Sequence, residues 1–131
     1  MPSGLNAELV ASLPDAGPVV MLNLMRFRAQ ASDGSGSGWD AYLRYSGLTM
    51  PLIKARGGTI LWAGTCEGVA LGDPGGPRWD YAALVTYPGR AAFLDMMQCP
   101  EYALANVHRE AGCEDHLILA TKETYSKFGR R

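Results

Sequence analysis

Hydrophobic positions recur along this chain with the two periods that distinguish strands from helices. Residues 19–27, VVMLNLMRF, place hydrophobic side chains on both alternating faces, which predicts a strand that is buried on both sides. Two further strands are predicted over residues 59–71 and 79–87, and a fourth over residues 116–121.

Four segments instead have the spacing of amphipathic helices, and glycines or prolines bound them. These segments are residues 5–13, 39–56, 90–98 and 101–112. The first is expected to end in a turn over residues 14–18. Pro51 is expected to kink the second helix or to split it near Met50, because proline removes one backbone hydrogen bond. Residues 29–38, rich in glycine and serine, predict a loop.

The order of these elements predicts an α+β fold. A short helix is followed by β-α-β-β-α-β, which is typical of a ferredoxin-like four-stranded antiparallel sheet with two helices on one face. The 131 residues are expected to form one such domain. Its core is predicted over residues 15–123, with an N-terminal helix in residues 1–14 and a polar tail over residues 124–131.

Two of the predicted strands have no polar face. A sheet with helices on one side exposes its other side to water unless something covers it. The strands at residues 19–27 and 79–87 are hydrophobic on both sides, so the simplest cover is the same face of a second copy. We therefore predict a homodimer through the sheet face, a dimeric α/β barrel, and a stable interface of this kind buries about 800 Å² per partner.

Composition and charge exclude several classes of protein. Hydrophobic residues make up 47% of the chain and charged residues 19%, which favours a packed core over disorder. The net charge is −1, and −4 without Lys127, Arg130 and Arg131, so no nucleic-acid partner is expected. No segment is long and apolar enough for a membrane span, and no membrane partner is expected. Three cysteines without an export signal predict a cytoplasmic protein.

Several segments resemble one family of small bacterial proteins. They are MLNLMRFR (21–28), WDAYLRY (39–45), ARGG (55–58), WDYAALVTYPGRAAFLDMM (79–97) and PEYALANVHREAG (100–112). Over about residues 19–121 the chain is similar to the domain of unknown function 1330 family, in the dimeric α/β-barrel superfamily. The resemblance implies the ferredoxin-like fold, the face-to-face dimer and a ligand cleft between helices and sheet. It supplies no established catalytic residues, because the family as a whole has no settled activity. The wider superfamily includes cofactor-independent monooxygenases, haem-degrading enzymes and lactone isomerases, so no single chemistry is carried over.

One amide and three aromatic side chains are candidates to line such a cleft. Asn23 lies in the middle of an apolar strand, so its amide needs a hydrogen-bond partner or a ligand. Tyr42, Tyr45 and Trp62 combine a hydrophobic ring with one polar atom, which suits an apolar pocket. Each of the three is also compatible with an ordinary place in the core.

Three further residues carry the charge or the proton chemistry that a ligand site could use. His108 is the candidate catalytic base, since its usual pKa suits proton transfer near neutrality. Arg109 could bind a carboxylate, although a structural ion pair with Glu101, Glu110 or Asp95 is slightly favoured. Arg26 could attract an anion at the rim of the cleft, or lie at a solvated strand end.

These residues leave two hypotheses open. The first is a cofactor-free enzyme, such as an isomerase, that acts on a small and partly apolar metabolite with His108 as base. The second is a non-catalytic dimer that binds a small molecule. Oxidative or haem chemistry is a further alternative, for which His108 is the plausible axial ligand. No metal site and no cofactor are expected, because His108 and His116 lack the spacing of a metal site.

Overall fold

The sheet and the helices follow the predicted order. The computed structural model describes residues 2–14 and 17–128. Within them the elements are α1 (Ala7–Ser12), β1 (Val19–Phe27), α2 (Gly38–Ala55), β2 (Thr59–Thr65), β3 (Tyr81–Tyr87), α3 (Arg90–Gln98), α4 (Pro100–Gly112) and β4 (Cys113–Thr121). Residues 15–16 of the predicted turn and residues 129–131 of the predicted tail lie outside this description.

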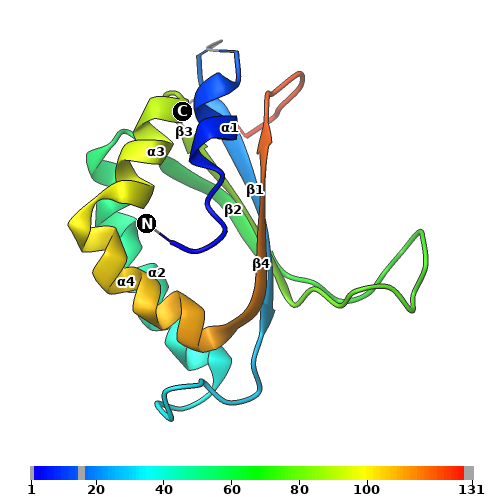
Figure 1. The fold of residues 1–131 in the computed structure, drawn as a ribbon. Helices are drawn as coiled ribbons and strands as arrows, with labels where there is room; N and C mark the ends of the chain where they lie inside the picture. The colour runs from blue at the N-terminus through cyan, green and yellow to red at the C-terminus, as the bar shows by residue number, and fades with distance from the viewer. Residues whose placement is uncertain (1, 15–16, 129–131) are drawn as a thin grey trace.

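The four strands form one antiparallel sheet in the order β2-β3-β1-β4. The most apolar strand, β1, is central and pairs with β3 on one side and β4 on the other. Helices α2, α3 and α4 all lie on one side of this sheet (Figure 1). The α+β, ferredoxin-like prediction is therefore confirmed.

The structure differs from the prediction at the end of β2, at the start of β4 and in the continuity of α2. Strand β2 ends at Thr65, and the glycine- and proline-rich residues 66–80 instead form an arm that extends away from the sheet (Figure 1). Strand β4 begins at Cys113, because the chain enters it directly from α4. Helix α2 runs through Pro51 without a break, so the predicted split is wrong. Its packing along α4 and its capping box at Ser37 offset the backbone hydrogen bond that proline removes.

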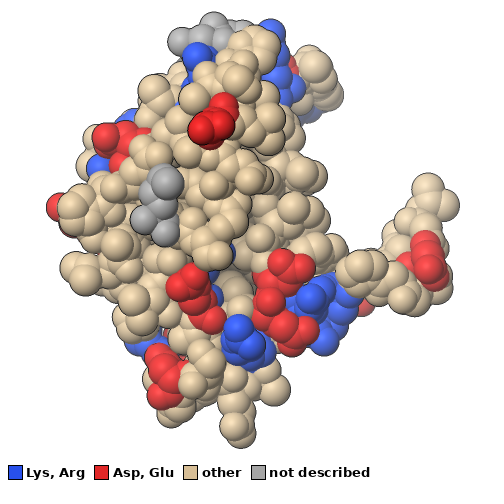
Figure 2. Space-filling model, in the orientation of Figure 1, with Lys and Arg blue, Asp and Glu red and all other residues tan. Residues whose placement is uncertain are grey.

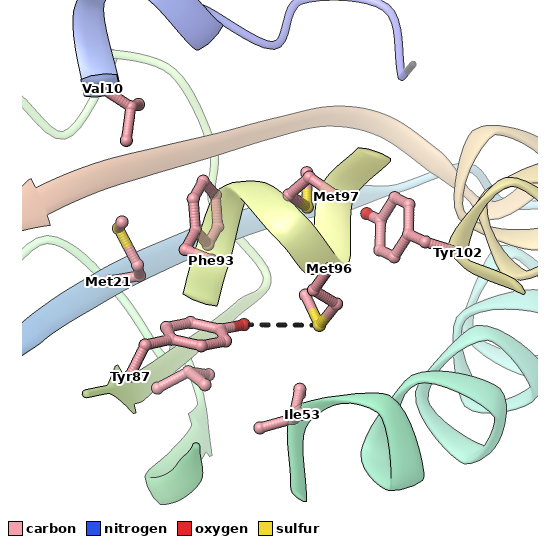
Figure 3. Close-up of a cluster of buried hydrophobic side chains, with 9 residues drawn as sticks. Val10, Met21, Ile53, Tyr87, Phe93, Met96, Met97 and Tyr102 are labelled. Atoms are coloured by element: carbon pink, nitrogen blue, oxygen red, sulfur yellow. Dashed lines mark hydrogen bonds between the residues drawn. The ribbon is translucent and has the colours of Figure 1, made fainter. Parts of the chain in front are cut away.

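The core lies between α3 and the sheet. Figure 3 shows Phe93, Met96 and Met97 of α3 facing Met21 and Tyr87 of the sheet. The hydroxyl of the buried Tyr87 donates to the sulfur of Met96 over 3.9 Å. Tyr102 of α4 packs against the same cluster, and α3 and α4 are thereby fixed to one face of the sheet.

The opposite face of the sheet is apolar and uncovered within the described residues. Leu117 and Leu119 on β4 are 40% and 46% exposed, and Trp62 on β2 is 48% exposed. The half-buried Leu22 of β1 pairs with Leu119 and belongs to the same surface, which we call the outer face. Charged side chains gather instead at its lower end, near the base of the arm (Figure 2). This hydrophobic face matches the one that the two-sided strands predict.

Candidate functional site

A histidine and an asparagine meet on the helix side of the sheet. Asn23 lies on β1 between Met21 and Met25, which are both buried against the helices. His116 on β4 pairs with Met25, so strand alternation directs its side chain to the same side. The imidazole Nε2 is 2.9 Å from the Asn23 Oδ1.

The hydrogen bonds around His116 determine its tautomer. The Asn23 amide nitrogen donates to the backbone oxygen of Met21 over 3.1 Å, which leaves the amide oxygen as acceptor for the Nε2–H. On the other side, Arg109 Nη1 lies 3.2 Å from His116 Nδ1. Because a guanidinium can only donate, Nδ1 is unprotonated and accepts. The imidazole is thus neutral and both of its nitrogens are bonded.

The surroundings of His116 keep it neutral well below physiological pH. Burial disfavours the imidazolium, and the positive charge of Arg109 adds to this effect, so the pKa of His116 falls to about 3. A histidine with this pKa is a weak base. Its evident role here is to accept a hydrogen bond and orient the guanidinium.

Two tyrosine hydroxyls form a further hydrogen bond with each other, and one of them, that of Tyr102, lines the same cavity as Arg109 and His116. The Tyr45 and Tyr102 oxygens are 2.8 Å apart, and they join α2 to α4. Burial raises the pKa of Tyr102, and the charge of Arg109 offsets part of that rise. Burial also raises the pKa of Tyr45 well above its ordinary value. Both hydroxyls are therefore protonated at physiological pH and serve as hydrogen-bonding groups.

Two cavities meet at His116. The larger, of about 460 Å³, lies between α4, β4 and the N-terminal segment, and Arg109, His116 and Tyr102 contribute polar groups to it, as do Ser3 and Asn6. The smaller, of about 150 Å³, lies under α2 and is lined by Asn23, Tyr45 and His116. The N-terminal segment and α1 run alongside β4 (Figure 1) and cover the larger cavity. The hydrogen-bonded side chains thus stand between two apolar spaces.

Arg109 is held by neutral groups. Its Nε donates to the Asn106 Oδ1 over 2.6 Å and its Nη1 to His116. Among residues 2–14 and 17–128, no carboxylate lies within ion-pair distance of it. The slightly favoured structural ion pair is therefore wrong. Asp95 instead pairs with Arg56 over 2.8 Å, because α3 directs that carboxylate toward the end of α2.

The structure brings four of the predicted site residues to the cavities. Arg109 lines the larger one, and Asn23, Tyr42 and Tyr45 line the smaller one. The Tyr42 ring also stacks on Trp39, at 5.8 Å between ring centroids. Tyr42 is thus held by its aromatic neighbours, whereas the hydroxyl of Tyr45 is hydrogen-bonded to that of Tyr102.

The other three predicted site residues lie elsewhere. Trp62 lies on the outer face, on the far side of the sheet from the cavities. Arg26 pairs with Glu114 over 3.0 Å and lies over the ring of Trp79, also away from the cavities. His108 is half-buried on α4 and lines neither cavity, and its buried Nδ1 has no hydrogen-bond partner among the described residues.

The sequence analysis did not select three residues that take part in this site, namely His116, Tyr102 and Asn106. His116 was considered only for metal binding, although it alternates with Ile118 and Ala120 along a predicted strand. Asn106 lies one helical turn before Arg109, a spacing that allows the bond between their side chains. These two signals were present in the sequence, whereas the approach of Tyr102 to Tyr45 depends on the packing of α2 against α4.

Comparisons with known proteins give relatives of unknown function. No protein-family model matches the chain, and none of the curated proteins does. The crystal structure of the RPA0582 protein, of unknown function, from Rhodopseudomonas palustris is similar with a TM-score of 0.84 and 31% identity, over 96% of this chain and 97% of that chain. The crystal structure of the methylated RPA0582 protein gives a TM-score of 0.84 and 32% identity, over 95% and 94%. The resemblance to the domain of unknown function 1330 family stays a prediction.

The described residues were also compared with the needs of metal and membrane binding. Among them, no three His, Cys, Asp or Glu side chains are grouped so that they could hold a metal ion. None of the helices in this part of the chain is long and apolar enough to span a bilayer.

Proposed function

The chain belongs to the family of the RPA0582 protein of Rhodopseudomonas palustris, and from this premise we propose that it is a homodimeric protein that binds a small molecule. We further propose that this family is part of the domain of unknown function 1330 group and shares its dimeric α/β barrel. Since that relative has no known function, the proposal depends on the side chains of this chain.

The observation that carries the proposal is the larger cavity. Its volume of about 460 Å³ lies within the range of small-molecule sites, roughly 300–1,000 Å³. Its walls are mostly apolar, and Arg109, His116 and Tyr102 are among the few polar residues that line it, with Ser3 and Asn6 of the N-terminal segment. This combination, an apolar enclosure with a small number of fixed polar groups, is typical of ligand pockets.

The same geometry favours binding over proton transfer. The histidine that lines the cavity is His116, and with a pKa of about 3 it is a poor base at neutral pH. Asn23 is occupied by His116 and the Met21 carbonyl, which leaves it little capacity to stabilise an oxyanion. Catalysis by His108 stays a prediction, and a His108→Ala variant with unchanged ligand affinity agrees with the binding proposal.

The uncovered outer face supports the dimeric part of the proposal. Leucines and a tryptophan form an apolar surface across the whole width of the sheet, where neighbouring strands contribute Trp62, Leu84, Leu22 and Leu119. Burial of apolar surface stabilises association by about 25 cal/mol for each Å². A second copy offers the same surface, so two copies related by a twofold axis can cover both faces at once.

Binding can be measured directly on the full chain. We expect octanamide, a neutral molecule with an apolar tail, to bind in isothermal titration calorimetry. A Val10→Trp variant places an indole in the wall of the cavity and should weaken this binding, because Val10 is buried there. Val107→Trp, at a position 60% exposed on α4, is the matched control and should bind as the wild type does. Octanamide affinity that is equal in both variants contradicts the proposal.

A further inference from the structure

The geometry of Arg109 points to the class of ligand. Building on the proposed binding function, we propose that the ligand is an organic monocarboxylate, whose carboxylate binds the guanidinium of Arg109 and whose apolar body fills the larger cavity.

Arg109 carries a positive charge that the described part of the chain does not neutralise. It is half-buried, and its bonded partners, Asn106 and His116, are both neutral. The acidic side chains at the start of β4 are engaged elsewhere, since Glu114 and Asp115 pair with Arg26 at 3.0 and 3.6 Å. A partly desolvated cation without a counter-ion is unfavourable, and a bound anion removes that cost.

The two neutral partners fix the orientation of the guanidinium. Asn106 accepts from Nε and His116 accepts from Nη1, so two of the three nitrogens are anchored. Both N–H groups of Nη2 and the second one of Nη1 remain without a partner among the described residues. A guanidinium that keeps free N–H groups on both Nη1 and Nη2 can bind the two oxygens of a carboxylate. His116 and Asn106 are in this view positioning residues for Arg109.

The walls of the larger cavity determine the rest of the ligand. Arg109 is the single Lys or Arg among the described residues that line it, and no Asp or Glu lines it. One anionic group is therefore matched and a second would be buried without a partner. The remaining surface is largely aliphatic and comes from α1, α3 and β4, with Leu5, Leu9, Val10, Leu13, Met97 and Ile118 among its residues. An aliphatic or otherwise apolar body fits this surface.

The test compares two probes that differ only in their polar head group, one of them charged and the other neutral. Octanoate and octanamide have the same tail, and both are titrated into the full chain by calorimetry. We expect the wild type to bind octanoate at least about tenfold more tightly, because hydrogen bonds between two ionised groups are stronger than those to a neutral amide. Arg109→Gln should bind the two probes equally. Arg44→Gln removes a charge from α2 at a residue that lines neither cavity, and it should keep the full preference.

The possible outcomes separate this inference from the binding proposal. Octanamide binding as tight as octanoate binding overturns the monocarboxylate and leaves small-molecule binding intact. No binding of either probe contradicts both. A preference that persists in Arg109→Gln overturns the role of Arg109. If Arg109→Gln does not fold, Arg109→Lys serves instead, and it should lose part of the preference because lysine keeps the charge without the paired N–H groups.

Discussion

The imidazole of His116 is bonded over 2.9 Å to the amide of Asn23, a residue 93 positions earlier in the chain. The two side chains lie on adjacent strands, β4 and β1, and both face the helices. Each also has a second partner, since His116 accepts from Arg109 and Asn23 donates to Met21. A polar group of this size inside an apolar core is costly unless each member is bonded, and here the bonds orient one cation toward a cavity.

The low pKa of His116 makes stability depend on pH. The unfolded chain takes up a proton near pH 6.5, whereas the native imidazole stays neutral down to about pH 3. The stabilisation is therefore complete above pH 6.5 and is lost as the pH falls through this window. We expect the free energy of unfolding to decrease toward a slope of about 1.4 kcal/mol per pH unit. Urea denaturation between pH 7 and pH 4.5 measures it.

A His116→Gln variant is the control for this slope. Glutamine cannot titrate but can still accept from Arg109, so the variant should lose most of the pH dependence in this range. The carboxyl groups with lowered pKa, Asp33, Asp40 and Asp80, begin to affect stability below about pH 5, and they contribute equally in the variant and in the wild type. An equally steep slope in His116→Gln would assign the effect to other groups.

Removal of the Asn23 amide should be costly. In Asn23→Ala the buried Nε2–H of His116 loses its acceptor, and an unsatisfied buried donor costs about 1–3 kcal/mol. A double-mutant cycle with His116→Ala isolates this term, because the second substitution removes the stranded group. We expect the two effects on the free energy of unfolding to be clearly less than additive. Strict additivity would mean that the bond contributes nothing.

The sequence predicted the fold more completely than the site. Period-two patterns in residues 19–27 and 79–87 gave the right strands, since burial on both sides is recorded directly in residue type. Helix α3 was predicted with its observed bounds because Pro88, Gly89 and Pro100 interrupt the chain around it. The end of β2 was misplaced, because residues 66–71 are apolar enough for a strand but have no partner in the sheet.

The site depended on contacts between distant segments. Asn23 and Arg109 were selected from the sequence, one for a polar group in a buried strand and the other for its charge on a helix, and both line the cavities. His108 was selected because its usual pKa suits proton transfer, whereas His116 was considered only as a metal ligand. Whether His108 reaches the cavity depends on which face of α4 lies against the sheet, and this face is determined by how α4 packs in the fold. Trp62 was expected to line the cleft but lies on the outer face, because a bulge between Ile60 and Trp62 shifts the alternation of side chains along β2.

Two glycines in α2 should respond in opposite ways to alanine. A Cβ at Gly38 would lie 2.2 Å from the backbone oxygen of Arg28 and 2.6 Å from that of Gly112, and these backbone atoms cannot move aside easily. Gly38→Ala should therefore destabilise the protein by several kcal/mol or prevent folding. Gly47, in the same helix, has no atom within 4 Å of such a Cβ. Gly47→Ala should stabilise by about 0.5–1 kcal/mol, because alanine favours helix.

Thermal unfolding of the two variants checks this pair. The melting temperature should fall strongly for Gly38→Ala and rise slightly for Gly47→Ala. A tolerated alanine at position 38 would show that α2 can shift away from the loop that precedes it. That result would also mean that the distance between α2 and α4 can change, although the Tyr45–Tyr102 hydrogen bond depends on this distance.

The outer face predicts the state of association. Light scattering on the wild type should give twice the chain mass of 14.1 kDa at micromolar concentration. Leu119→Lys places a charge in the middle of that face, where Leu119 is 46% exposed and pairs with Leu22 across the sheet. A buried lysine without a partner opposes association, so we expect this variant to be monomeric or to dissociate at much higher concentration.

Leu104→Lys is the control, since Leu104 is 72% exposed on α4, on the helix side of the fold. Because that position lies away from the sheet surface, its variant should keep the wild-type mass. A wild-type mass of a single chain would remove the dimer while leaving the cavity and Arg109 unaffected.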